Sequence, residues 1–129
     1  MSVSKTHFIF YVQDQARSTH FYAQVLAQTP SLDVPGMAEF VLADGCVLGL
    51  MPIAGINRLM GDKIKDPSLA LGIPRAEIYL YVPDPAAYVE RAKSAGATLL
   101  SELEQRDWGD LAGYCADPDG HVIAFACRQ

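Results

Sequence analysis

The chain has few cysteines and no long apolar run, and each of these absences excludes a class of protein. Its three cysteines, Cys46, Cys115 and Cys127, are an odd number without a Cys-x-x-Cys spacing, which argues against a disulfide framework and a zinc knuckle. We therefore expect reduced thiols that pack as small hydrophobic side chains. No apolar stretch approaches the roughly 20 residues that a membrane-spanning helix needs, so a membrane is not an expected partner.

Positive charge is also scarce. Ten Lys and Arg stand against fifteen Asp and Glu, which gives a formal net charge of −5. No basic run is long enough to follow a phosphate backbone, so nucleic acid is not an expected partner either. The residues that open the sequence lack the apolar core of a signal peptide, and we therefore expect a cytoplasmic location.

What is present is typical of one globular domain that contains an internal repeat. The chain has 129 residues, of which 50% are apolar and 19% charged. Residues 8–14 (FIFYVQD) resemble residues 78–84 (IYLYVPD), and residues 44–50 (DGCVLGL) resemble residues 119–125 (DGHVIAF). Each half thus begins with an apolar strand that ends at Asp, and finishes with an Asp-Gly turn that enters another strand.

Between these landmarks the signals predict a strand, a helix and three further strands in each half. Asp14 and Asp84 stand where a carboxylate caps the first turn of a helix, and Pro85 suits the first helical position. Gly96 is expected to end the second helix, and Asp44-Gly45 and Asp119-Gly120 are expected to form two-residue hairpin turns. The sequence therefore predicts an α+β domain with modules at about 1–52 and 76–129, joined by a connector at 53–75 that is rich in Gly and Pro.

Alternation along the strands separates an apolar face from a mixed face. The first strand of each half places apolar side chains beneath the helices: Phe8, Phe10 and Val12, then Ile78, Leu80 and Val82. The opposite face carries a mixed set: His7, Ile9 and Tyr11, then Glu77, Tyr79 and Tyr81. The closing strands add small and apolar side chains to this mixed face: Val47, Gly49 and Met51, then Val122, Ala124 and Ala126. Such a composition predicts a half-apolar ligand cavity, and burial against another subunit is the alternative.

These features together resemble the vicinal oxygen chelate superfamily, which includes glyoxalase I, bleomycin resistance proteins and extradiol dioxygenases. The resemblance rests on the duplication and on the order of four segments: the strand at 7–14, Phe21-Tyr22, Trp108-Gly109 and Asp117-Pro118-Asp119-Gly120. It implies two tandem βαβββ modules whose curved mixed sheets surround a cleft. It also implies a homodimer.

The resemblance to glyoxalase I implies four metal-ligand positions, which fall here on His7, Gly49, Glu77 and Ala124. Gly49 and Ala124 have no side-chain donor atom, so we expect no tightly bound metal and no cofactor. His7 and Glu77 remain as a candidate catalytic pair, one as a general base and the other as its orienting carboxylate. A structural polar bridge is the alternative role for this pair.

Three functions, from two classes, follow. The first is a metal-free protein of the bleomycin-resistance type that holds an aromatic or drug-like ligand in the cleft, with an acidic balance that favours a cationic ligand. Its expected ligand-binding residues are Ile9, Tyr11, Gly49, Met51, Tyr79, Tyr81, Trp108 and Ala124. The alternative is a divalent-metal lyase, isomerase or dioxygenase that uses His7 and Glu77. A metal-free enzyme that uses the same pair for proton transfer is a third possibility.

Overall fold

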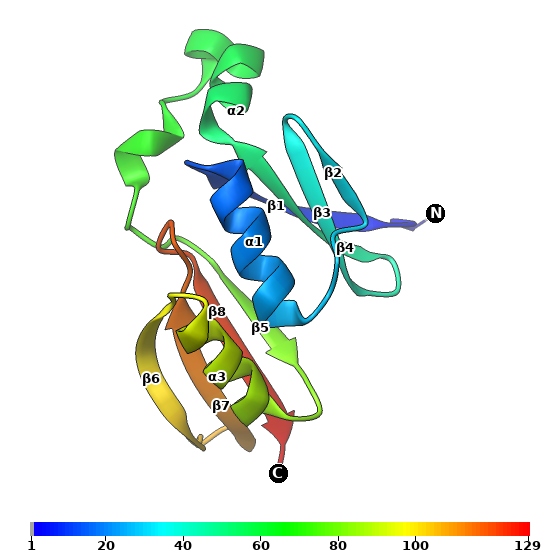
Figure 1. Ribbon diagram of the computed structural model, residues 1–129, viewed down its shortest axis with the longest axis vertical. Helices are drawn as coiled ribbons and strands as arrows, with labels where there is room; N and C mark the ends of the chain where they lie inside the picture. The colour runs from blue at the N-terminus through cyan, green and yellow to red at the C-terminus, as the bar shows by residue number, and fades with distance from the viewer. Residues whose placement is uncertain (1) are drawn as a thin grey trace. The chain divides into compact units, whose positions relative to one another are not determined.

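Two four-stranded mixed sheets, one in each half of the chain, form the framework of the protein (Figure 1). The computed structural model describes residues 2–129, which divide into two units. The first unit comprises the residues up to 23 and 27–69, and the second comprises 24–26 and 70–129. The α+β class expected from the sequence is confirmed.

The two halves have the same order of elements. The first contains β1 (Thr6–Val12), α1 (Gln15–Leu26), β2 (Leu32–Val34), β3 (Met37–Ala43) and β4 (Cys46–Pro52). The second contains β5 (Glu77–Tyr81), α3 (Pro85–Ser94), β6 (Thr98–Gln105), β7 (Asp110–Ala116) and β8 (Val122–Arg128). The strand orders, β1-β4-β3-β2 and β5-β8-β7-β6, are equivalent. In the first sheet β1 pairs in parallel with β4, and in the second β5 pairs in parallel with β8. This is the duplicated βαβββ arrangement that the repeat predicts.

Local signals in the sequence account for the ends of the helices. The Asp14 carboxylate accepts a hydrogen bond from the backbone N–H of Arg17, and that of Asp84 accepts one from Ala87. Both contacts satisfy amides that have no partner within the first turn. Beyond α3, Gly96 adopts a φ of +99°, as expected for a residue that ends a helix in the left-handed region.

In the first unit, the core lies between α1 and the sheet. Tyr22 packs against Phe40 at 6.4 Å between ring centroids, and Leu48 and Leu50 of β4 are fully buried. The prediction that Phe8 lies beneath a helix is wrong, because this residue is 55% exposed although its strand partner Leu48 is buried. The reason is topological: β1 is an edge strand of its sheet, so a side chain on it has a neighbouring strand on one side only.

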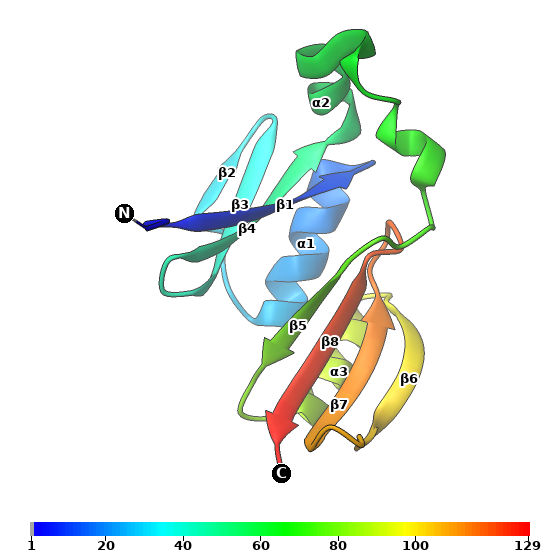
Figure 2. The ribbon, with the colours of Figure 1, turned by 180° about the vertical axis from the view of Figure 1, so that it is seen from behind.

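In the second unit, α3 covers one face of the sheet, and Figure 2 shows the other face in front of it. Ile123 and Phe125 are buried on the covered face, where Tyr88 of α3 lies 5.5 Å from the Phe125 ring. Burial raises the pKa of the Cys115 thiol, which is also on this face. A buried protonated thiol is a poor nucleophile, in keeping with a packing role.

The two expected hairpin turns differ in the structure. Asp44-Gly45 is a two-residue turn between Ala43 and Cys46, as predicted. The second turn is longer, because Asp117 N–H donates to the carbonyl of His121 and leaves residues 118–120 outside the ladder. Proline at position 118 suits a wider turn, in which Gly120 takes a φ of +89°.

The connector contains α2 (Ile53–Met60) and two short 3₁₀ helices, η1 (Gly61–Lys63) and η2 (Pro67–Ala70). Its end packs against the second hairpin turn, where Gly72 N–H donates to the carbonyl of Asp119 at 3.2 Å. A Cβ on Gly120 would lie 2.8 Å from the Cα of Gly72, so two glycines meet at a very close backbone approach. Within residues 2–129, no helix is long and apolar enough to cross a membrane.

Candidate functional site

Four aromatic side chains gather on the face of the second sheet that α3 leaves uncovered. Tyr79 and Tyr81 alternate with the core residues of β5, and Tyr114 pairs with the same β8 residue as Tyr79. The Tyr79 ring lies 5.4 Å from that of Tyr81 and 6.4 Å from that of Tyr114, both edge to face. Trp108, in the turn before β7, donates its indole N–H to the Tyr79 hydroxyl at 2.9 Å. We call Tyr79, Tyr81, Tyr114 and Trp108 the aromatic face.

A buried carboxylate joins these aromatic residues. Asp110, the first residue of β7, is 1% exposed. Its Oδ2 accepts hydrogen bonds from the hydroxyls of Tyr79 at 2.7 Å and Tyr81 at 2.8 Å. A buried ionised carboxylate needs such donors to replace its water. Asp110 therefore holds the Tyr79 and Tyr81 side chains directly, and it holds Trp108 through the Tyr79 hydroxyl.

The other oxygen of this carboxylate has no hydrogen-bond donor. Among the buried side-chain oxygen and nitrogen atoms of residues 2–129, Asp110 Oδ1 is the one without a hydrogen bond. Arg128 Nε lies 3.5 Å away, which makes an ion pair, and its guanidinium carbon lies 5.5 Å from the Tyr81 ring centroid. The Arg128 side chain is itself 76% exposed. The site thus holds one buried acceptor and one loosely held cation.

The electrostatics of the group follow from these contacts. The hydrogen bond from Tyr79, then that from Tyr81, lowers the pKa of Asp110 below its usual 3.8, so the carboxylate is ionised at neutral pH. Burial is the main cause that raises the pKa of Tyr79, and the hydrogen bond to Asp110 is the main cause for Tyr81. Burial, followed by the charge of Glu77, raises the pKa of Tyr114. The phenols therefore remain protonated and act as hydrogen-bond donors.

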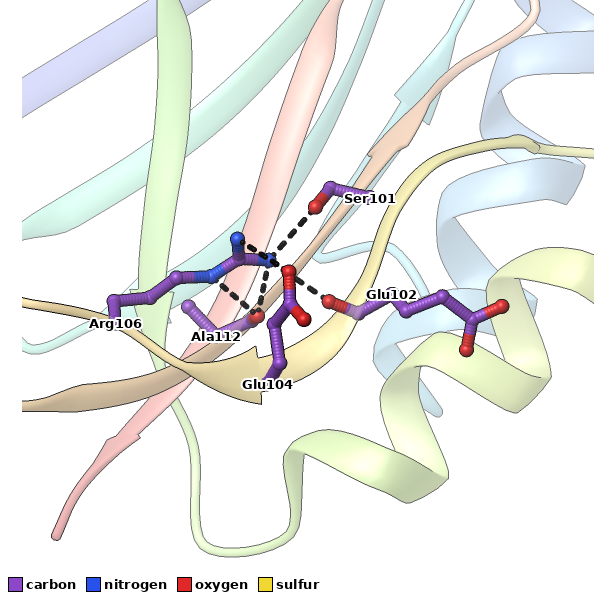
Figure 3. A network of polar contacts seen from close by, with 5 residues as sticks. All are labelled: Ser101, Glu102, Glu104, Arg106 and Ala112. Carbon is purple, nitrogen blue, oxygen red and sulfur yellow. Dashed lines mark hydrogen bonds and ion pairs between the residues drawn. The ribbon is translucent and has the colours of Figure 1, made fainter.

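Arg106, the residue that follows β6, is the centre of a network of polar contacts beside this site (Figure 3). Its guanidinium donates to the carbonyls of Glu102 and Ala112 and to the Ser101 hydroxyl, and pairs with Glu104 at 3.1 Å. These contacts bridge the stretch of β6 in which the register with β7 shifts. The Arg106 guanidinium also lies 5.2 Å from the Tyr114 ring centroid. Arg106 therefore ties the irregular strand to the aromatic face.

The first sheet carries a different pair on its uncovered face. His7 Nδ1 lies 3.5 Å from the Glu39 carboxylate, and Glu39 pairs across the strands with Gly49. Glu77, the other member of the expected catalytic pair, lies in the second unit. The structure therefore gives His7 a carboxylate partner from its own sheet, on β3, which is separated from β1 by β4.

The structure divides the expected ligand-binding residues between the two sheets. Ile9, Tyr11, Gly49 and Met51 lie in the first sheet, whereas Tyr79, Tyr81 and Ala124 lie in the second, with Trp108 before β7. Side chains cover both small residues. A Cβ on Gly49 would lie 3.1 Å from Ile9 and 3.2 Å from Met37, and Ala124 is 0% exposed between its partners Tyr79 and Tyr114. Neighbouring side chains of the same sheet therefore fill the space that a larger residue at Gly49 or Ala124 would occupy.

The four metal-ligand positions implied by the resemblance do not form a complete donor set. Gly49 and Ala124 offer no donor and are buried beneath neighbouring side chains. Within the first unit, His7 and Glu39 would be the nearby protein ligands of a divalent ion, and this number is smaller than a zinc site uses. The residues present therefore do not fit the four-ligand centre.

One further group of donors lies in the second hairpin turn. Ligand atoms of Asp117, Asp119 and His121 lie within 4.8 Å of one another. Asp117 Oδ1 accepts the backbone N–H groups of Asp119 and His121, both at 2.9 Å. These hydrogen bonds account for the position of the Asp117 side chain as part of the turn.

Sequence reasoning missed Tyr114, Asp110, Glu39, Arg106 and Arg128. The sequence did contain a signal for Asp110, which stands two residues after Trp108. It alternates in step with Ala112 and Tyr114 along β7, so these three side chains are on the same face of the strand. An aspartate at a strand start usually reads as part of a solvated turn, so its burial was not expected. The repeat counterpart of Glu39 is Tyr114, since these residues pair with the equivalent positions Gly49 and Ala124, so the repeat did not mark a carboxylate there.

The chain is similar to known proteins over most of its length. Residues 6–125 match the model of the Glyoxalase/Bleomycin resistance protein/Dioxygenase superfamily. An uncharacterized protein of Mycobacterium bovis is 33% identical over 113 residues, which cover 85% of this chain and 74% of that protein. An uncharacterized protein of Mycobacterium tuberculosis has the same identity, and the match covers 66% of its length.

Solved structures share the fold. A glyoxalase-related enzyme from Fulvimarina pelagi superposes with a TM-score of 0.79 at 24% identity, covering 95% of this chain and 86% of that one. A glyoxalase/bleomycin resistance protein/dioxygenase family enzyme from Burkholderia phytofirmans gives a TM-score of 0.78 at 17% identity, covering 95% and 97%. At these identities the likeness concerns the fold alone. The family match, the duplicated modules and the two equivalent sheets together show that the chain belongs to the glyoxalase/bleomycin resistance protein/dioxygenase superfamily.

Proposed function

We propose that the protein binds an aromatic or drug-like small molecule, without a metal, on the aromatic face of the second sheet. The observation that carries this proposal is the cluster of four aromatic side chains organised around the buried Asp110 carboxylate. Tyrosine and tryptophan offer flat apolar surfaces with polar ends, and they suit the recognition of planar ligands.

The exposure of the cluster supports a ligand-facing role. Tyr81 is 57% exposed and Trp108 is 53% exposed, although both make polar contacts that restrict their side chains. Exposed aromatic residues that are held in one orientation lose little conformational entropy on binding. A surface of this kind is better suited to stacking against a ligand than a set of freely rotating side chains.

The donor set argues for binding rather than metal catalysis. Two of the four positions at which metal-dependent relatives hold their ion have no donor atom, so no metal-assisted step can be derived from this chain's residues. The fold by itself does not decide the chemistry, because one fold hosts both binding proteins and enzymes.

The proposal can be tested with the protein's single tryptophan. In a ¹H–¹⁵N NMR spectrum, the one indole N–H signal reports on Trp108 and hence on the aromatic face. We expect aromatic fragments that bind the protein, as measured by calorimetry, to shift this signal. We also expect Tyr81→Ala to weaken their binding by about tenfold or more, as for a residue at the centre of an interface.

A matched control uses Leu69, which is 73% exposed on η2 and is not part of the aromatic face. Leu69→Ala also removes an exposed apolar side chain, but it should leave the affinity unchanged. Fragments that bind without moving the Trp108 signal, or that bind equally well to Tyr81→Ala and the wild type, would contradict the proposal.

A further inference from the structure

The second unit contains a position for a cation, and one of its own arginines occupies it. Asp110 Oδ1 is buried without a hydrogen bond, and the Arg128 guanidinium lies beside it and over the Tyr81 ring. We infer that the aromatic face takes a planar ligand bearing a cationic N–H donor group, an amidinium or guanidinium, which pairs with Asp110 and displaces Arg128. This inference rests on the proposed function and names the ligand class for the same site.

The Asp110 carboxylate has acceptor capacity left on only one of its oxygens. Both tyrosine hydroxyls donate to Oδ2, so the acceptor capacity that remains is on Oδ1. An ionised carboxylate oxygen that is cut off from water and has no donor is costly, and a charged N–H group is its best partner. The site is therefore complementary to a donor that carries positive charge.

Arg128 is only weakly held by this carboxylate. Its Nε is 3.5 Å from Oδ1, too far for a strong charge-assisted hydrogen bond, and its side chain is 76% exposed. An ion pair with so exposed a partner contributes little stability. A ligand group that makes the short hydrogen bond can therefore take the place of Arg128 at small cost.

Aromatic rings lie close to the position that the Arg128 guanidinium occupies. The guanidinium carbon of Arg128 lies 5.5 Å from the Tyr81 centroid, within the range over which a ring face attracts a cation. Trp108 and Tyr79 lie on the same face and offer further ring surface. An anion that used Arg128 instead would leave Oδ1 unpaired and would face the charge of Asp110, so a cationic ligand is favoured.

Three probes of similar size separate charge from hydrogen bonding. Benzamidine has a planar ring and a cationic N–H donor, benzamide has nearly the same shape without the charge, and phenyltrimethylammonium has the charge without an N–H group. Calorimetry would measure the affinities, and the Trp108 indole signal would show that binding occurs at this face. We expect the affinity for benzamidine to be at least about tenfold higher than the affinity for either of the other two probes.

Variants of the two charged residues test the assignment directly. Arg128→Ala should tighten benzamidine binding by about threefold or more, because the internal competitor is gone. Lys93→Ala is the matched control, since it removes the same charge from α3, where Lys93 pairs with Glu90. It should not change the affinity. Asp110→Asn should abolish the preference for benzamidine over benzamide.

The outcomes distinguish this inference from the proposed function. Equal binding of benzamidine and benzamide with a shift of the Trp108 signal would overturn the cation site and leave the aromatic ligand site standing. Benzamidine that does not shift the Trp108 signal, or that binds Arg128→Ala more weakly than the wild type, would also overturn the cation site. If Asp110→Asn does not fold, the Arg128→Ala result decides the question, because an exposed side chain can be removed without loss of the fold.

Discussion

The close approach of Gly120 and Gly72 makes Gly120→Ala the most quantitative test of the structure. An alanine at a φ of +89° is strained by about 1–2 kcal/mol. Its Cβ would also lie 2.8 Å from Gly72 Cα, about 0.7 Å inside an ordinary carbon contact. Moving the connector to relieve this overlap would break the hydrogen bond from Gly72 to Asp119, at a net cost of about 1 kcal/mol. We therefore expect Gly120→Ala to lower the free energy of unfolding by about 2–3 kcal/mol.

Gly96→Ala is the matched control in the same unit. Gly96 has a φ of +99°, and a Cβ there would meet no atom within 4 Å. The substitution therefore introduces the backbone strain alone and should cost about 1–2 kcal/mol. Urea titrations followed by Trp108 fluorescence would compare the two variants. Amide hydrogen exchange should also show faster exchange at Gly72 in Gly120→Ala than in Gly96→Ala.

The test compares the losses in free energy of unfolding that Gly120→Ala and Gly96→Ala cause. Any gain from a stiffer unfolded chain is common to both substitutions and cancels in the comparison. If the two variants lose the same free energy and Gly72 exchanges equally in both, the connector does not pack against the second hairpin turn and the reasoning is refuted.

Four further predictions concern the core, the site and the assembly. Phe125→Ala should cost about 3–5 kcal/mol because its side chain is 0% exposed, whereas Phe8→Ala should cost less than about 1 kcal/mol; equal losses in urea titrations would contradict the assignment of Phe8 to an open edge. The pKa of Asp110 is lowered by folding and those of Tyr79 and Tyr81 are raised. The melting temperature should therefore fall below pH 3.8, because the unfolded chain binds a proton that the folded Asp110 resists, and above pH 10.0, because the phenols ionise more readily in the unfolded chain. The alkaline fall should be shallower in a Tyr79→Phe/Tyr81→Phe variant, and an unchanged fall would count against the cluster. Elemental analysis of untagged protein should find no stoichiometric Zn, Ni, Fe or Mn, and one equivalent per chain would restore the metal-dependent alternative. Light scattering should give the mass of a homodimer of the 14.0 kDa chain, and a monomer at micromolar concentration would contradict this.

Much of the fold could be predicted from the sequence because its signals are local. The carboxylate caps at Asp14 and Asp84, the Asp44-Gly45 turn and the helix end at Gly96 each depend on a few neighbouring residues. The repeat then indicated the order of the helix and strands along each half of the chain, since two copies of one unit have the same local signals in the same order. The second hairpin was misjudged because the Asp-Gly pair is local, while the Asp117 to His121 bond that widens the turn is made across it.

The candidate site was predictable only in part. Alternation within β5 placed Tyr79 and Tyr81 on one face, because side chains on a strand alternate with a period of two. Alternation within one strand cannot show which residue of another strand lies beside them. Asp110 reaches the two hydroxyls only because β7 pairs with β8, and β8 with β5.

The sequence by itself determined the duplicated α+β architecture, the helix caps and the aromatic character of one sheet face, all of which follow from short-range geometry. The tertiary structure alone decided that Asp110 is buried and shared by two tyrosines, that Arg128 is its loosely held partner, and that His7 pairs with Glu39. It also decided that Phe8 is exposed at a sheet edge. Burial and ion pairing depend on which strands become neighbours, and strand pairing joins residues that are far apart in the chain.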